Sequence, residues 1–497
     1  MNNNKDEQQT SYREIMKATS LFGGVQVINI LISIIRTKFV AIILGPSGVG
    51  IVGLLISTTD LVGRLTNFGL GTSAVKNVAS ANESGNQLKI ETILVVLQRL
   101  VWITGLLGFI FTIVFSSLLS QIAFGDKSYT LSFIWISITL LFNQLSSGQL
   151  VVLQGLRKLQ HLAKANLYGS LLGLIISVPL YYKYGVDAIA PTIIITSLGN
   201  LLLTWYFAGK IEVEVVKVSS IRTLAEGKKM LKMGFVISLS GMIAMGASYF
   251  VRIFISNIGG VEQVGLYNAG FAIINSYVGL IFSAMGTDYY PRLSAVSHSD
   301  ELCKKIINQQ AEIAILILGP IIMAFLVFIN WVVVILYSSE FVGINDMLHW
   351  VSIGMFFKAA GWSIGFIFLA KGASTLFFLN ELVANFYMLV FNVFGYHFMG
   401  LTGIGISFLA GFMLYLLQVS YLSKRKFNFS FESGFSKIIL IQVFISIICF
   451  LVIKFLMPPY SYFIGVLLIM ISLLHSVREL NMRIGLKNLM RKFLKRT

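Results

Sequence analysis

Long apolar segments recur along the whole chain, and they restrict its fold more than any other feature of the sequence. A helix needs about 20 apolar residues to cross the roughly 30 Å of hydrocarbon in a bilayer. One of these segments, INILISIIRTKFVAIILGPSGVG at 28–50, is long enough yet carries Arg36 and Lys38. Only 12% of the 497 residues are charged, about half the fraction found in soluble proteins. The sequence therefore predicts an all-α polytopic membrane protein.

Glycine, proline and charged residues divide the apolar sequence into about fourteen predicted transmembrane helices. The predicted spans are 18–43, 48–74, 91–120, 130–154, 160–182, 186–208, 231–257, 263–289, 305–337, 343–370, 374–398, 401–422, 437–457 and 459–476. The N-terminal sequence is polar and has neither an apolar core region nor a cleavage site, so we expect a cytosolic leader and not a signal peptide.

The distribution of basic residues predicts the orientation. With both termini on one side, 29 of the 38 Lys and Arg residues fall on that side, three fall on the other, and six lie inside spans. Cytoplasmic loops carry an excess of Lys and Arg, so both termini are predicted to be cytoplasmic. The net charge of +17 then reflects topology, and nucleic acid is not an expected partner.

An internal repeat predicts the domain organisation. VGIVGLL at 49–55 matches VGLYNAG at 264–270, and Gly71-Thr72 matches Gly286-Thr287 at the same interval along the chain. Six helices separate the matches, which predicts a parallel repeat. The predicted parts are an N-lobe at 1–209, a cytoplasmic basic linker at 210–230, a C-lobe at 231–422, two extra helices at 437–476, and a basic amphipathic tail at 477–497 that lies on the membrane surface.

Charged residues inside the spans are the candidate functional residues. The six cations are Arg36, Lys38, Arg64, Arg99, Arg252 and Lys358, and the clearest carboxylates are Asp60 and Glu381. Each cation costs about 3 kcal/mol at a helix centre before relief by water or snorkelling. Gln26, Asn29, Ser33 and Arg36 share one helix face, as do Ser57, Asp60, Arg64 and Asn67. Such polar faces are expected to point into a bundle or a water-filled cavity.

Some of these charges have structural interpretations as well. Lys38 is expected to snorkel to the interface, and Asp60 and Arg64 are spaced to neutralise one another. Lys358 and Glu381 lie on adjacent predicted helices and are a second candidate pair. The excess of cations nevertheless predicts an anionic ligand, and the arginine fork suits phosphate. The predicted binding residues are Arg36, Arg64, Arg99, Arg252, Lys358 and Asn29, with Asp60 and Glu381 as candidates for ion coupling.

Other kinds of site are not predicted. Cys303 and Cys449 lie in different segments, so no disulfide framework is expected. The five histidines have no metal-ligand spacing. The sequence lacks a GxxxxGK[ST] motif, so no ATP hydrolysis is expected. The predicted external loops are short and carry no paired carboxylates, so we expect neither an enzyme nor a cofactor.

Three motifs in the first third of the chain carry a resemblance to a known family. LGPSGVG at 44–50, FGLGTSAVK at 68–76 and LQGLRK at 153–158 resemble the polysaccharide-specific Wzx flippases. These belong to the multidrug/oligosaccharidyl-lipid/polysaccharide (MOP) superfamily, with the MATE exporters and the lipid II flippases. Length, helix number and the two-lobe repeat extend the resemblance over most of the chain.

The resemblance implies a carrier in the bacterial inner membrane that takes part in O-antigen and lipopolysaccharide biosynthesis. Its cargo would be an undecaprenyl-diphosphate-linked oligosaccharide, moved by alternating access, with the polysaccharide polymerase machinery as a further candidate partner besides membrane lipids. Arg36, Arg64, Arg99 and Arg252 are the positions that would line its cationic cavity. An ion gradient acting through Asp60 or Glu381 would drive the cycle.

Three alternatives remain open at the level of sequence. A lipid II flippase also needs a cationic cavity and fourteen helices. A MATE-type drug or ion exporter has the same architecture, but its usual cationic drugs favour a cavity richer in carboxylates. A membrane glycan polymerase is the alternative from another class, and the short external loops disfavour it.

Overall fold

The computed structural model describes residues 2–211, 216–275 and 279–485. Among these residues the secondary structure consists of helices and the connections between them, with no strand, which confirms the all-α class. Contacts divide the chain into two units, Met1–Gly265 and Leu266–Thr497, named unit 1 and unit 2 below.

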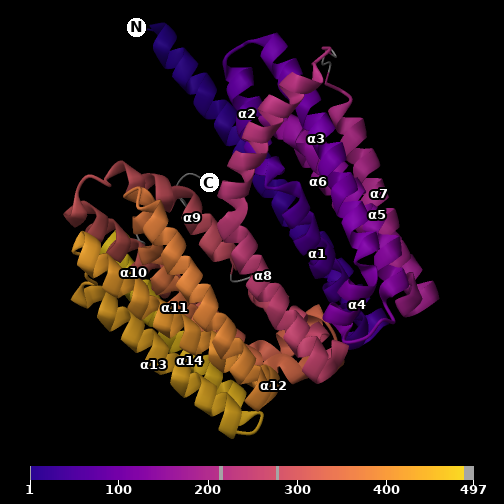
Figure 1. Ribbon diagram of the computed structural model, residues 1–497. Helices are drawn as coiled ribbons and strands as arrows, with labels where there is room; N and C mark the ends of the chain where they lie inside the picture. Colours follow the sequence, from indigo (N-terminus) through magenta and orange to yellow (C-terminus); the bar gives the residue numbers. More distant parts are fainter. Residues whose placement is uncertain (1, 212–215, 276–278, 486–497) are drawn as a thin grey trace. The chain divides into compact units, whose positions relative to one another are not determined.

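Unit 1 is a helical bundle in which helices distant in sequence pack together (Figure 1). Its helices are α1 (Asn2–Asn67), α2 (Leu70–Glu83), α3 (Gln87–Val114), α4 (Ser116–Phe124), α5 (Thr130–Gly155), α6 (Leu159–Tyr184), the 3-10 turn Gly185–Ala188, α7 (Ile189–Ala208) and most of α8 (Ser220–Ile273). Helix α5 packs between α3 and α7, and α6 packs against α1 and α7. Buried Leu, Ile and Val side chains of α2, α3 and α5 form its largest described apolar core.

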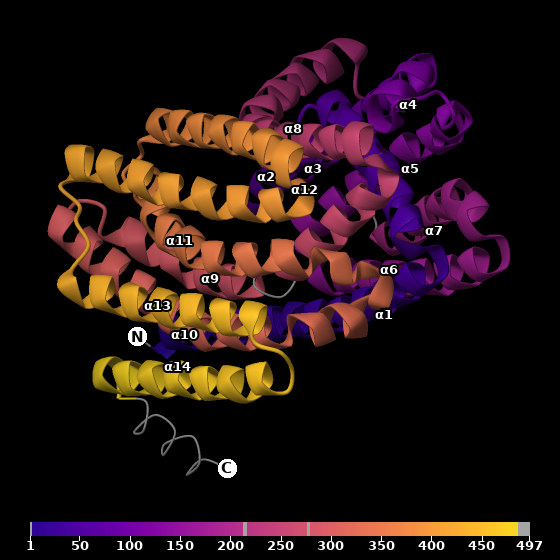
Figure 2. The ribbon, with the colours of Figure 1, turned by 90° about the horizontal axis from the view of Figure 1, so that it is seen from below.

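Unit 2 is built around α10 and α11. It contains α9 (Gly279–Ala295), α10 (Asp300–Leu336), the 3-10 turn Ser339–Ile344, α11 (Asn345–Ala370), α12 (Ser374–Phe427), α13 (Ser433–Phe455) and α14 (Tyr460–Ile484). Helix α11 packs against α10 and α12, while α13 and α14 lie together along α10 (Figure 2). Ser299 begins α10 by accepting a hydrogen bond from the Leu302 N–H, and Asp300 and Glu301 follow in its first turn, where carboxylates favour the helix dipole.

Ten described helical stretches are long and apolar enough to cross a membrane. Three of them, 24–67, 159–208 and 374–427, have 44 to 54 residues and so are long enough for two crossings each at about 1.5 Å per residue. These ten stretches identify the chain as a multi-pass membrane protein. The predicted span 263–289 includes residues 276–278, which lie outside the described part of the chain.

Three helix boundaries in particular differ from the predicted parts of the chain. The span predicted at 48–74 breaks at Phe68 and Gly69, which both have positive φ, and the Gly69 N–H donates to the Asn67 side chain at 2.8 Å. Helix α8 begins at Ser220, inside the predicted linker, because Ser219 accepts a hydrogen bond from the Arg222 N–H. Helix α14 extends into the predicted tail, whose residues 486–497 lie outside the described part.

The backbone conformation repeats at the same interval as the sequence motifs. This is the interval between positions 49 and 264. Left-handed residues occur in three pairs at this spacing: Gly45 and Gly260, which interrupt α1 and α8; Arg157 and Gly372; and Gly185 and Gly400. The φ angles within each pair are similar, for example 57° at Gly185 and 58° at Gly400. Residues with φ above zero are uncommon unless a turn requires them. Three coincidences at one interval therefore confirm the repeat.

The same interval relates a reciprocal contact between α1 and α8. A Cβ atom on Gly265 would overlap the Pro46 carbonyl, and one on Gly50 would overlap the Val261 carbonyl. The sequence separation between Pro46 and Val261 equals that between Gly50 and Gly265. Small residues let helix backbones approach closely in membrane proteins, so this contact depends on glycine at both positions.

Replacing Gly265 by alanine is expected to destabilise the protein by about 1–3 kcal/mol, because the added methyl group forces the two backbones apart. The check is the thermal unfolding midpoint of the purified protein in detergent. Gly246→Ala, on the same helix with nothing within 4 Å of the added Cβ, is the matched control and should leave the midpoint unchanged or raise it slightly. Equal midpoints for the two variants would contradict the close contact.

Candidate functional site

A polar cavity of about 530 Å³ lies within unit 1. Four helices contribute its polar lining: Gln26, Asn29 and Arg36 from α1; Asn143, Ser146 and Ser147 from α5; Asn166 and Ser170 from α6; and Thr196, Asn200 and Thr204 from α7. Arg36 is the only charged residue among the described residues that line it. We call this space the polar cavity.

Arg36 lies at the edge of the polar cavity and reaches across to α6. Its Nε donates a hydrogen bond to Ser177 Oγ at 3.2 Å. Gly173 makes room for the guanidinium, because a Cβ there would lie 3.2 Å from Arg36 Nη1. Ser177 is a neutral acceptor, so this bond orients the guanidinium and leaves its charge uncompensated.

Asn29 lines the same cavity two turns before Arg36. Its Oδ1 atom is buried and has no hydrogen-bond partner within the described structure. Buried polar atoms are nearly always hydrogen-bonded in native proteins. Asn29 and Arg36, which the sequence places on one helix face, both line the polar cavity.

Asp60, Arg64 and Arg252 form a second group in unit 1. Arg64 and Arg252 lie close enough to Asp60 for electrostatic interaction, with Arg64 the stronger of the two. Arg252 Nη1 donates to Ser248 Oγ at 2.7 Å and to the Ser248 carbonyl at 3.2 Å. Asp60 and Arg64, both described and both exposed, are not among the ion pairs of the described chain. Asp60 therefore lies in the electrostatic field of two arginines.

Arg99, on α3, is not among the residues that line the polar cavity. Its Nη1 donates to the Val218 carbonyl at 3.0 Å and to Thr223 Oγ1 at 2.7 Å, which ties α3 to the start of α8. Arg99 also lines a separate groove of about 1190 Å³ whose walls are mainly apolar, together with Lys228 and Lys232. The structure does not bring Arg99 together with Arg36.

In unit 2, Lys358 and Glu381 have separate surroundings. The Lys358 ammonium lies 5.4, 5.7 and 5.9 Å from the ring centres of Phe412, Phe408 and Phe282, within range of cation–π attraction. Glu381 accepts a hydrogen bond from the Tyr415 hydroxyl at 2.9 Å. The ion pairs found in the described part of the chain do not include one between Lys358 and Glu381.

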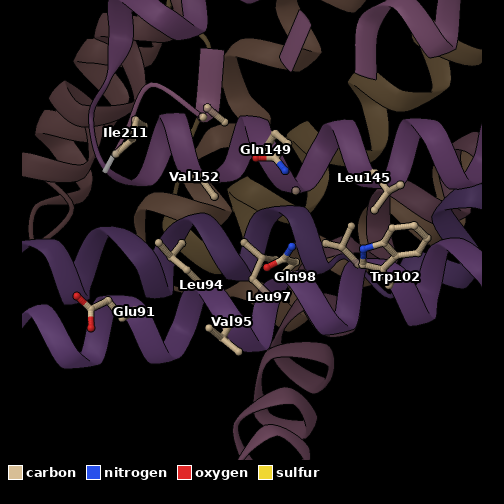
Figure 3. A pocket seen from close by; sticks show the side chains of 14 residues that line it. Glu91, Leu94, Val95, Leu97, Gln98, Trp102, Leu145, Gln149, Val152 and Ile211 are labelled. Carbon is tan, nitrogen blue, oxygen red and sulfur yellow. The ribbon is translucent and has the colours of Figure 1, made fainter. Parts of the chain in front are cut away.

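The sequence analysis missed two sets of residues. The carboxamides of α5, α6 and α7 carry no charge, and the search for buried charges passed over them. Glu91 was missed as well: it is only 3% exposed and lines a small pocket of about 230 Å³ between α3 and α5. Figure 3 shows Gln98 and Gln149 on either side of that pocket. Glu91 opens a predicted span, and that position made it look like a surface residue.

A model of the family described as "Polysaccharide biosynthesis protein" matches residues 39–346. The chain belongs to this family. A relative from Shigella flexneri, named as a putative O-antigen transporter, is 26% identical over 417 residues, which cover 82% of this chain and 96% of the relative.

Solved structures of the MOP superfamily share the fold. The lipid II flippase MurJ, in an inward closed conformation, is similar with a TM-score of 0.68 at 12% identity, over 94% of this chain and 99% of its own. A MATE multidrug transporter in an inward-facing conformation has a TM-score of 0.66 at 16% identity, over 82% and 96% of the two chains. The predicted resemblance to Wzx-type members of this superfamily is confirmed, and these relatives are named as transporters and flippases, not as enzymes.

Replacing Arg99 by methionine is expected to leave the Val218 carbonyl and the Thr223 hydroxyl without their donor, at a cost of about 1–2 kcal/mol. Hydrogen exchange of the amides at 218–226 should become faster while that of α5 stays unchanged. Arg157→Met is the matched control, because Arg157 forms an exposed ion pair with Glu83 at 2.9 Å, and such pairs contribute about 0–1 kcal/mol. Unchanged exchange at 218–226 would contradict the tether.

Replacing Lys358 by methionine is expected to stabilise unit 2 by about 1–3 kcal/mol, because the cost of burying an uncompensated cation exceeds the cation–π attraction. Thermal unfolding in detergent measures this. Lys371→Met should act in the opposite direction, since Lys371 has a partner in Asp300. A lower midpoint for Lys358→Met than for Lys371→Met would show that the three phenylalanines stabilise the charge.

Proposed function

We propose that the protein is a flippase that moves an undecaprenyl-diphosphate-linked oligosaccharide across the bacterial inner membrane by alternating access. The Shigella relative is named for O-antigen transport, and MurJ for flipping lipid II. One name gives an O-antigen as the cargo and the other gives a lipid, and an oligosaccharide joined to a lipid combines the two. The same class of cargo for this chain is the simplest extension of its family membership.

One observation carries the proposal: four cations within the predicted spans form no ion pair with a carboxylate among the described residues. The ion pairs that the described structure contains involve Arg157, Lys229, His349, Lys371 and Arg483. Arg36, Arg64, Arg99 and Lys358 have no part in them. A cation at membrane depth is costly and usually marks a substrate pathway, so an anionic group in the cargo is the natural counterion.

A diphosphate suits these cations better than the alternatives do. Arginine donates two parallel hydrogen bonds to phosphate oxygens and stays charged at every relevant pH. A cationic drug, as exported by MATE proteins, would be repelled by Arg36 and Arg64, which form no ion pair among the described residues. Arg36, Arg64 and Arg252 are therefore our choice for the diphosphate contacts, while Arg99 acts as a tether.

Net transport needs a difference in affinity between the inward-open and outward-open states. We propose that both termini are cytoplasmic, that lobes at 1–209 and 231–422 alternate in access, and that an ion gradient acts on Asp60 or Glu381. Asp60 is the stronger candidate, since a change in its charge would directly alter the field at Arg64 and Arg252.

Replacing Arg64 by glutamine is expected to reduce flipping about tenfold or more, because it removes a charged hydrogen-bond donor to the diphosphate, whereas Arg64→Lys should retain part of the activity. The assay measures lipid-linked oligosaccharide on each leaflet of spheroplasts with a membrane-impermeant glycosidase, in cells with and without the protein. Arg157→Gln is the control and should flip normally.

The outcomes separate the alternatives. Accumulation of the oligosaccharide lipid on the cytoplasmic leaflet without the protein, not cleared by Arg64→Gln, supports the proposal. Accumulation of lipid II instead would favour the lipid II flippase. Normal appearance of oligosaccharide on the outer leaflet without the protein would refute a role in flipping this lipid.

A further inference from the structure

The polar cavity differs in chemistry from the cation groups beside it. Ten of its fifteen lining residues carry neutral amide or hydroxyl side chains, one carries a charge, and none carries a carboxylate. A pocket that binds a drug-sized molecule is usually lined mainly by apolar and aromatic side chains. This cavity is polar without being strongly charged, which narrows the class of ligand that it suits.

The five carboxamides of the cavity have unused hydrogen-bonding capacity. Gln26, Asn29, Asn143, Asn166 and Asn200 make no side-chain hydrogen bond to another residue that the structure describes. Each carboxamide offers two donor hydrogens and an acceptor oxygen. Gln26, Asn143 and Asn166 are exposed, and Asn29 and Asn200 are half-buried, so these groups are open to water and can exchange it for a ligand.

Four of the five hydroxyl groups of the cavity, all but that of Ser147, are already hydrogen-bonded within the protein. Thr196 donates to the Thr192 carbonyl at 2.7 Å, and Ser170 donates to the Asn166 carbonyl at 3.0 Å. Ser146 and Thr204 share a hydrogen bond of 3.1 Å. These hydroxyls keep a free lone pair, so they supply acceptors while the carboxamides supply both kinds of group.

Two glycines one helical turn apart on α6 create the space. A Cβ on Gly169 would lie 2.5 Å from Asn200 Oδ1, and one on Gly173 would lie 3.2 Å from Arg36 Nη1. The helix therefore presents backbone to the cavity at the two places where a side chain would meet a polar lining group. A volume of about 530 Å³ is within the range of roughly 300–1,000 Å³ for small-molecule sites.

Donor chemistry excludes several ligands. Divalent Ca²⁺ and Mg²⁺ sites usually include carboxylate oxygens, and no carboxylate lines the cavity. A multiply charged anion would have only Arg36 as a counterion, and an apolar molecule would leave the carboxamides unsatisfied. An uncharged ligand with many hydroxyl groups matches the alternation of free donors and acceptors.

We propose that the polar cavity is a sugar-binding subsite, in which the five carboxamides bind the uncharged, hydroxyl-rich sugar of the cargo and Arg36 marks the boundary with its diphosphate. This inference rests on the proposed function and adds the substrate class of one specific cavity. It divides recognition into a neutral part in the cavity and a charged part at Arg64 and Arg252.

The test uses two probes and the full chain in lipid nanodiscs. One probe is the free oligosaccharide released by mild acid from the lipid-linked pool of cells that lack the protein, and the other is inorganic diphosphate. Binding of each is measured by NMR titration, by saturation transfer for the sugar and by ³¹P line broadening for diphosphate. Asn200→Leu removes a carboxamide and keeps the branched shape of the side chain, and Gly169→Ala narrows the cavity without removing a polar group. Gly246→Ala and Asn392→Leu, both outside the cavity, are the matched controls.

Both cavity variants are expected to bind the oligosaccharide at least tenfold more weakly than the parent, while their affinity for diphosphate changes less than twofold. Arg64→Gln should show the reverse. If Asn200→Leu does not fold, as judged by its thermal midpoint, Gly169→Ala decides the result by itself.

The failures are distinguishable. Unchanged oligosaccharide affinity in a folded cavity variant, or equal loss for both probes, would overturn the sugar subsite and leave the flippase proposal standing. Cells that accumulate no lipid-linked oligosaccharide when they lack the protein, together with a parent protein that does not bind diphosphate, would overturn the proposed function and the subsite with it.

Discussion

The cost of a charge in hydrocarbon is the constraint on which the rest of this structure depends. Each cation inside a span costs several kcal/mol unless water, a dipole or a counterion compensates it. The protein meets this cost in three different ways. Arg36 and Arg252 donate to neutral hydroxyl groups of Ser177 and Ser248, Arg99 donates to a carbonyl and a hydroxyl, and Lys358 lies among phenylalanine rings. Arg36, Arg99 and Lys358 make these contacts with neutral groups, so each keeps a positive charge that a ligand can use.

The internal repeat shows how few sequence identities are needed to preserve a backbone. Gly45 and Gly260 both take left-handed φ values, but Arg157 matches Gly372 in conformation and differs from it in residue type. Glycine is required where a Cβ would collide, as at Gly50 and Gly265, and is replaceable where only the turn matters. The repeat is therefore faint in the sequence and clear in the backbone, because close approach restricts residue type and turn geometry does not.

The sequence was sufficient to predict the helical class, most helix boundaries and the family resemblance, because each follows from local apolar runs broken by Gly45, Gly400 and similar residues. It was also sufficient to place Asn29 and Arg36 on one face, since they share one helix. It could not predict that Arg99 would contact Val218, which is distant in the chain, or that Glu381 would pair with Tyr415 and not with Lys358. Those contacts depend on how helices pack, which periodicity within one helix does not specify. The carboxamides of α5, α6 and α7 form a cavity only in three dimensions.

The separation of neutral from charged groups bears on selectivity. A diphosphate is common to every polyprenyl-linked precursor, so the contacts proposed at Arg64 and Arg252 would attract all of them equally. Binding energy shared by competing substrates cannot discriminate between them. A site built to hydrogen-bond particular hydroxyl groups can, because the wrong sugar leaves buried polar atoms without partners. On this argument, the cations would determine the affinity for any such lipid. Asn143, Asn166 and Asn200 would determine the specificity for the glycan. Exchange of these neutral residues, with Arg36 and Arg64 kept, is then the route by which a relative on this fold would acquire a different sugar.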